Sequence, residues 1–90
     1  MKFTYDSVKN DSNLAKHGLP LSDAKLLDWD SAISWIDERK NYGQERRIAL
    51  VLMNGRLYCV IYVESTVAMR IISLRKANAR EIDRYEKENN

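Results

Sequence analysis

Four arginines that follow one another near the end of the chain are the residues best suited to chemistry. They are Arg70, Arg75, Arg80 and Arg84, within Met69–Tyr85. A guanidinium is always charged and offers a planar fork of N–H donors that fits a phosphate at two points. The stretch therefore predicts a site for polyanions, provided that the fold brings some of these side chains together.

The charge distribution favours the same part of the chain. Residues 1–45 carry six Lys/Arg against eight Asp/Glu, whereas residues 46–90 carry nine against five. Seven of the eight arginines lie in this second half. A solvated basic face explains the pattern as well as a surface that binds polyanions, so charge alone leaves both interpretations open.

Several classes of chemistry are disfavoured by composition. Three glycines, far apart, make no phosphate-binding loop, and one histidine cannot supply a paired-histidine acid–base mechanism. The single cysteine, Cys59, lacks neighbours at metal-ligand spacing. An arginine-rich site without metal or cofactor suits cleavage of RNA by its own 2′-hydroxyl, because the protein then needs only to hold the chain, move protons and stabilise the phosphorane.

The arginines require a strand and a helix to position them. The run Ala68–Leu74 has the β-branched character of a strand, and Asn78 with Glu81 has the spacing of a capping box that starts a helix at Ala79 and ends near Glu88. Ile82 and Tyr85 then share the apolar side of that helix.

The clearest structural signal is a hairpin over Arg46–Glu64, with Asn54-Gly55 as its tight turn. One face of it is aliphatic, and we expect the helices to cover that face with Cys59 in the core. We expect the opposite face, with Tyr58 and Tyr62, to be the binding face, where Tyr62 stacks on RNA bases.

The side on which Arg70 lies depends on the turn that follows the hairpin. A three-residue loop places Arg70 on the face of Tyr58 and Tyr62, while a two-residue loop places it opposite. We expect the first, because an unpaired guanidinium in an aliphatic layer is costly. Strand alternation then predicts that Arg75 points the other way.

The first third of the chain predicts a strand and two helices. Lys2–Tyr5 has the pattern of a strand, and a helix capped by Asp6 or Ser7 reaches His17 before Gly18 ends it. A second helix is expected from Ser22, with Leu21 and Leu26 in contact as a hydrophobic staple and with Ala24, Leu26 and Leu27 on its buried side.

The middle of the chain predicts a loop, a strand and a loop. Asp28-Trp29-Asp30 is expected as a loop, Ala32–Ile36 as a short strand, and the charged segment Asp37–Gln44 as an exposed loop.

Length and cysteine content limit the architecture. Ninety residues make one domain, 1–90, with a modest core. The expected fold is α+β: an antiparallel sheet of four to five strands, packed on one face by two N-terminal helices, with a C-terminal helix. A lone cysteine and the lack of an apolar leader or span predict a cytoplasmic protein.

At this level of detail the chain resembles a known family. An early aromatic strand precedes Asp6, and the pattern N-x-x-K-H-G occupies 13–18. Glu45-Arg46 leads into Ile48-Ala49-Leu50, and R-I-I-S-x-R-K-A-x-x-x-E-x-x-x-Y occupies 70–85. Together these patterns, in this order, resemble the BrnT toxins of bacterial type II toxin–antitoxin pairs.

The resemblance implies a RelE-like fold, an endoribonuclease that inhibits translation, and a BrnA-like ribbon-helix-helix antitoxin. Operator DNA would be bound only through that antitoxin, in a hetero-oligomer. The implied catalytic residues are Arg70, Arg75, His17 and Glu45. The implied RNA-binding residues are Lys16, Arg46 and Tyr85, to which the hairpin pattern adds Tyr62.

Each of these residues also has a purely structural interpretation. Asn13 can bond the loop after its helix, Glu45 can pair with Arg46, and Arg75 can tie the strand to the last helix. His17 can interact with a helix end. The tryptophans, Trp29 and Trp35, fill the core or anchor an antitoxin. The alternative function is a non-catalytic module that binds antitoxin or nucleic acid as a co-repressor.

Overall fold

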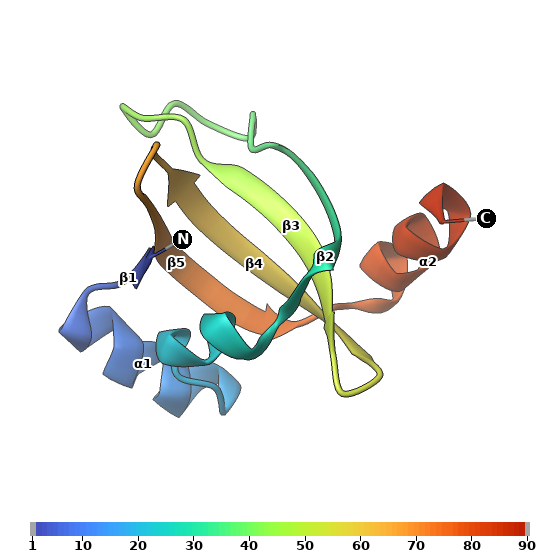
Figure 1. Ribbon diagram of the computed structural model, residues 1–90, viewed down its shortest axis with the longest axis horizontal. Helices are drawn as coiled ribbons and strands as arrows, with labels where there is room; N and C mark the ends of the chain where they lie inside the picture. The colour runs from blue at the N-terminus through green and yellow to red at the C-terminus, as the bar shows by residue number, and fades with distance from the viewer. Residues whose placement is uncertain (1, 90) are drawn as a thin grey trace.

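The computed structural model describes residues 2–89; the two end residues of the expected domain, 1 and 90, lie outside that part. One mixed sheet with strand order β1-β5-β4-β3-β2 forms the centre (Figure 1). The elements are, in order, β1 (Lys2–Thr4), α1 (Ser7–His17), the 3₁₀ helix η1 (Leu21–Leu26), β2 (Asp28–Ile36), β3 (Arg47–Met53), β4 (Arg56–Glu64), β5 (Ala68–Lys76) and α2 (Ala79–Glu88).

The α+β class is confirmed, but the expectation of a wholly antiparallel sheet is wrong. The chain returns at its end to lie beside its first strand, and β1 pairs in parallel with β5, with Phe3 opposite Met69. The pairs β2–β3, β3–β4 and β4–β5 are antiparallel. Such a long-range pairing has no local signal in the sequence.

Helix α1 begins and ends as its sequence predicts. The side chain of Asp6 accepts hydrogen bonds from the backbone N–H groups of Val8 and Lys9 at 2.9 and 3.1 Å. Gly18 adopts the left-handed conformation, with φ 74°, that ends a helix without steric cost.

The expected second α-helix is wrong, because the segment forms the 3₁₀ helix η1 after Pro20. Ser22 does not cap it; its backbone N–H instead donates to Asn10 Oδ1 at 3.1 Å. The proposed staple is also absent, since Leu21 is fully buried while Leu26 is 60% exposed. Ala24 and Leu27 are buried as expected.

Strand β2 starts earlier than expected, so the predicted loop Asp28-Trp29-Asp30 is wrong, while the strand over Ala32–Ile36 is confirmed. A bulge between Asp28 and Ile33 allows the early start. Trp29 stabilises it by donating from Nε1 to Ala24 O at 2.9 Å.

The hairpin is confirmed in register and turn. Met53 pairs with Arg56, and Asn54 and Gly55 both have positive φ. Its two faces are both covered, which corrects the expectation of one covered and one open face. We call them the η1 face and the α2 face, after the element that covers each.

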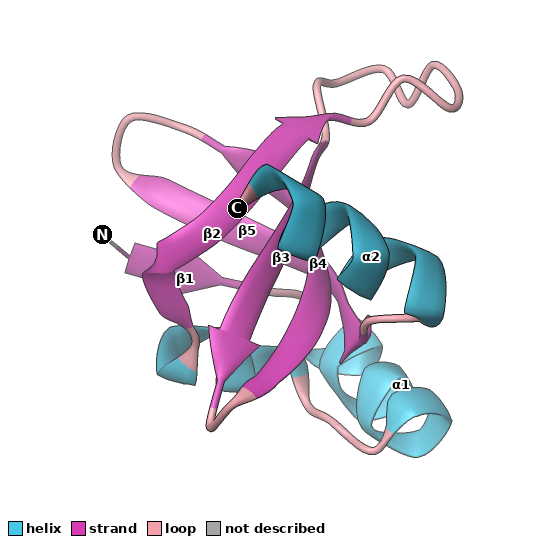
Figure 2. Ribbon diagram, turned by 90° about the vertical axis from the view of Figure 1, so that its right-hand side faces the viewer, coloured by secondary structure: helices cyan, strands magenta, loops and turns pink. Residues whose placement is uncertain are grey.

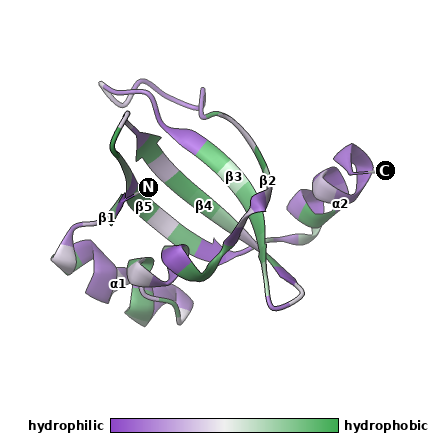
Figure 3. Cartoon of the chain, viewed as in Figure 1, coloured by the Kyte–Doolittle hydropathy of each residue, from purple (hydrophilic) through white to green (hydrophobic). Residues whose placement is uncertain are grey.

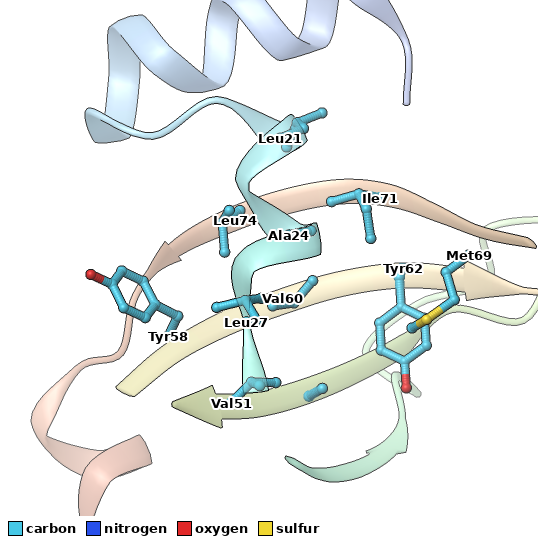
Figure 4. Close-up of a cluster of buried hydrophobic side chains, with 11 residues drawn as sticks. Leu21, Ala24, Leu27, Val51, Tyr58, Val60, Tyr62, Met69, Ile71 and Leu74 are labelled. Atoms are coloured by element: carbon cyan, nitrogen blue, oxygen red, sulfur yellow. The ribbon is translucent and has the colours of Figure 1, made fainter. Parts of the chain in front are cut away.

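The η1 face holds the larger core. Buried side chains of the sheet meet those of η1 there, as Figure 4 shows for most of them. The cluster consists of Leu21, Ala24, Leu27, Ala49, Val51, Tyr58, Val60, Tyr62, Met69, Ile71 and Leu74. The proposed binding face is therefore the main core. Its mixed composition misled the prediction, because two buried phenols resemble an exposed polar surface.

Helix α2 lies over the sheet on the α2 face (Figure 2), and this face holds a smaller, mainly aliphatic cluster. Ile48, Leu50, Leu57 and Cys59 form it, with Trp35, Ile61 and Tyr85 packed against it. No residue of α2 is buried, and the helix is largely hydrophilic in Figure 3. Helix α2 therefore depends on a few specific contacts to hold its place.

Candidate functional site

Arg70 lies on the α2 face, so the prediction that it shares a face with Tyr58 and Tyr62 is wrong. Ser65 N–H donates to Ala68 O at 2.9 Å and Glu64 pairs with Met69, so Arg70 lies opposite Val63. The register that we considered less favourable is present. Its expected cost does not arise, because Arg70 is exposed at a part of this face that the aliphatic cluster does not cover.

Arg75 lies on the α2 face as well, which corrects the expectation that it points away from Arg70. An irregularity of register next to Ile61 adds one residue to β5 and shifts its alternation, so that Ser73 pairs with Ile61 and Arg75 pairs with Cys59. Two of the four arginines of the opening stretch therefore share one face of one strand. Five residues of strand separate them by about 16 Å, so they suit two phosphates that are not adjacent in an RNA chain.

Arg75 also ties the strand to the last helix, as its structural interpretation predicts. Its Nη1 and Nη2 donate to the two carboxylate oxygens of Glu81, each at 2.9 Å. The same carboxylate accepts from the backbone N–H of Asn78 at 2.9 Å and completes the predicted capping box. The bond with Glu81 is the main reason why the pKa of Arg75 is raised.

We expect Glu81→Gln to lower the free energy of unfolding by about 1 kcal/mol at neutral pH. The effect is this small because Arg75 is partly exposed and solvent screens its ion pair with Glu81. Burial acts to raise the pKa of Glu81, but the bonds from Arg75 and Asn78 hold it below its usual value. A carboxylate whose pKa is lower in the folded state than in the unfolded state stabilises the fold at pH values above its unfolded pKa. This stabilisation is lost as the pH falls through the folded pKa. The difference between wild type and variant in urea unfolding should therefore shrink at pH below about 4. The exposed Glu86→Gln is the control; an equal difference at both pH values would contradict the assignment.

The loop after β2 adds cationic groups that the sequence analysis did not identify. Asp37 N–H donates to Arg46 O at 2.7 Å, which extends the β2–β3 pairing by one residue. The Asp37 carboxylate accepts from Arg39 Nε and Nη2, both at 2.8 Å, and from Tyr42 OH at 3.1 Å. The segment was correctly predicted as a loop, but Asp37 is buried within it. The signal available was an acid two residues before an arginine at a strand end.

Arg46 is placed by this loop. Its guanidinium carbon lies 4.2 Å from the centre of the Tyr42 ring, a cation–π contact. Its Nε is buried and has no hydrogen-bond partner among the described residues. No ion pair between Glu45 and Arg46 is present there, so their structural interpretation as a pair is not confirmed.

The two tyrosines proposed to bind RNA have other positions. Tyr62 is 4% exposed, and its ring packs edge-on against Trp29 with centroids 5.6 Å apart. Little of its ring is accessible to a base, so we withdraw Tyr62 as an RNA-binding residue. The hydroxyl of Tyr85 donates to Ser31 O at 2.7 Å, which fixes α2 to β2. Arg84 also fixes the helix, with its guanidinium 3.6 Å from the centre of the Trp35 ring.

The remaining candidates do not join the arginines. Lys16 and His17 lie in the last turn of α1, a helix that packs on β5 and η1. Glu45 is exposed before β3. No hydrogen bond or ion pair within residues 2–89 connects His17 or Glu45 to Arg70 or Arg75. The two arginines thus share one face of β5, and no bond among the described residues ties His17 or Glu45 to either of them.

Asn13 of the N-x-x-K-H-G pattern has a structural role. Its Nδ2 donates to Leu19 O and to Leu74 O, each at 2.7 Å, while Leu74 N–H donates to its Oδ1 at 3.3 Å. The predicted bond to the loop is confirmed. The bonds to Leu74 show that the side chain pairs with the free edge of β5 as a strand would.

Cys59 is a core residue, as expected, and burial raises the pKa of its thiol to about 11. Within residues 2–89, no three His, Cys, Asp or Glu side chains gather where they could hold a metal ion. In the same part of the chain, no helix combines the length and apolar character that a membrane crossing requires.

Comparison with known protein families gives a match over most of the chain. A family model described as "Ribonuclease toxin, BrnT, of type II toxin-antitoxin system" matches residues 5–81. No curated protein matches the chain.

Proposed function

Because the chain belongs to the BrnT family of ribonuclease toxins of type II toxin–antitoxin systems, we propose that its 1–90 domain is a metal-free endoribonuclease whose activity inhibits translation. The observation that carries this proposal is the common face of Arg70 and Arg75. Two guanidinium groups on one strand, beside further arginines from the loop, suit the spaced charges of an RNA backbone.

In the proposed mechanism the 2′-hydroxyl of the RNA attacks the adjacent phosphorus, and the 5′-oxygen of the next nucleotide leaves. Arg70 donates to the non-bridging oxygens and stabilises the phosphorane, and Arg75 holds a phosphate farther along the RNA chain. Glu45 or His17 removes the proton from the nucleophile and returns one to the leaving group. Lys16, Arg46 and the exposed edge of Tyr85 guide the RNA.

Arg75 differs from Arg70 in being already paired. Its fork is occupied by Glu81, whereas Arg70 has no ion-pair partner among the described residues. For this reason we propose that Arg70 is the main catalytic cation. The main role of Arg75 is then to hold α2 in place through its bond with Glu81.

Membership of a type II system implies an antitoxin partner. We propose a BrnA-like ribbon-helix-helix protein that forms a hetero-oligomer with this chain in the cytoplasm and carries the pair to operator DNA.

A non-catalytic co-repressor is the second candidate, and the separation of His17 and Glu45 from the arginines favours it. Such a module would bind RNA or the antitoxin and leave RNA intact.

Expression of the chain alone from a tightly repressed promoter distinguishes the two. We expect growth arrest with fragmented RNA on induction, rescue by the protein encoded in the adjacent reading frame, and normal growth with Arg70→Ala. Normal growth and intact RNA while the wild-type protein accumulates in folded form would reject the ribonuclease and leave the co-repressor.

A further inference from the structure

The pair of Asp37 and Arg39 combines a fully buried acid with an exposed base. The side chain of Asp37 is 0% exposed, while that of Arg39 is 62% exposed. Burial of a carboxylate is costly unless its oxygens are bonded, and here Arg39 Nε and Nη2, the Arg39 backbone N–H and Tyr42 OH all donate to it. The result is a guanidinium fixed in one orientation on an otherwise irregular loop.

The guanidinium of Arg39 has N–H groups that do not bond Asp37 and can donate to a ligand. An arginine has five N–H groups, and Asp37 takes one from Nε and one from Nη2. Nη1 of Arg39 donates no hydrogen bond to any other group among residues 2–89. An arginine held in place loses less conformational entropy when it binds a phosphate than a free one does.

The position of Arg39 relates it to the candidate site. Asp37 lies on the α2 face, because it is two residues after Trp35, which packs on that face, and because its bond with Arg46 continues the pairing of β2 with β3. Burial is the main cause that raises the pKa of Cys59, and the positive charge of Arg39 opposes that rise. A hydrogen bond to Glu81 is the main cause that raises the pKa of Arg75, and the charge of Arg39 opposes that rise as well. The charge of Arg39 therefore reaches groups on the α2 face, although Arg39 belongs to the loop after β2 and not to β5.

We propose that Arg39 binds a phosphate of the RNA substrate and that Asp37 is the residue that positions it. The inference rests on the proposed function for the identity of the ligand. It adds to that function a contact from the loop, so that RNA is held between Arg39 and the two arginines of β5.

Binding of a fluorescein-labelled single-stranded RNA whose 2′-hydroxyls are methylated tests the proposal without cleavage. Affinity is measured by fluorescence anisotropy from about 50 to 200 mM salt, with protein made by cell-free synthesis. We expect Arg39→Ala to make the slope of log affinity against log salt less steep by about 0.7. This is the value for one lost phosphate contact on a single strand. The exposed Arg80→Ala, which removes the same charge from α2, should leave the slope unchanged.

Two further variants separate charge from position. Arg39→Lys should keep the slope, because its charge remains, and so should Asp37→Asn. With unmodified RNA both should lower kcat/KM several-fold, since the fork is lost or no longer fixed. A wild type that binds but does not cut RNA rejects the ribonuclease, while the slopes still decide the role of Arg39. A slope for Arg39→Ala equal to that of Arg80→Ala, or no RNA binding by the wild type, would overturn the inference.

Discussion

Replacement of Arg70 by alanine should lower the rate of RNA cleavage by about 10²–10³-fold, the effect of removing one charge-stabilising donor. The phosphorane carries more negative charge than the bound RNA, so the guanidinium stabilises the transition state more than the ground state. The loss should therefore appear in kcat, with a smaller change in KM. Single-turnover cleavage of a labelled RNA measures it.

The fold should survive this change. Arg70 is exposed, and no ion pair or side-chain hydrogen bond of the described residues involves it. A hydrogen bond from Lys9 N–H is the main cause of the lowered pKa of Asp6, and the charge of Arg70 is a lesser one. Urea unfolding should therefore shift by no more than about 0.5 kcal/mol. Arg80→Ala is the matched control, and equal cleavage by the two variants would reject a catalytic role for Arg70.

Asn13→Ala should lower the free energy of unfolding by about 3 kcal/mol, a large effect for one polar side chain. The side chain makes three hydrogen bonds, with Leu19 O and with both backbone groups of Leu74. It is buried, so truncation leaves these groups unpaired where water has little access. The midpoint of urea unfolding measures the change.

Two variants sharpen this test. Ser12→Ala, an exposed neighbour in the same helix, should change stability by less than about 0.5 kcal/mol. Asn13→Asp keeps the shape but loses the N–H donors, and it should destabilise at least as much as alanine. Stability of Asn13→Asp close to that of the wild type would show that these bonds contribute little.

Local signals predicted the local structure well. Asp6 and Gly18 mark the ends of α1, Asn54-Gly55 makes the hairpin turn, and Asn78 with Glu81 starts α2. Each of these depends on backbone groups within a few residues, which is why sequence alone suffices.

Features that depend on distant segments could not be predicted in this way. The two-residue turn after Ser65 places Arg70 on the α2 face, and the bulge in β5 keeps Arg75 on that same face; neither has a distinctive residue pattern. The burial of Tyr62 depends on η1 and Trp29. The sequence therefore placed Arg70 on the wrong face of β5, while the roles of Arg70 and Arg75 stay predictions.

The central claim is that this chain cuts RNA through its own 2′-hydroxyl with the help of Arg70. The most direct measurement is mass spectrometry of the fragment ends after RNA is incubated with wild-type protein and with Arg70→Ala in excess EDTA. The account predicts 2′,3′-cyclic phosphate ends with the wild type and intact RNA with the variant. Intact RNA with both proteins, ends that bear a 5′-phosphate, or equal cleavage by the two would contradict it.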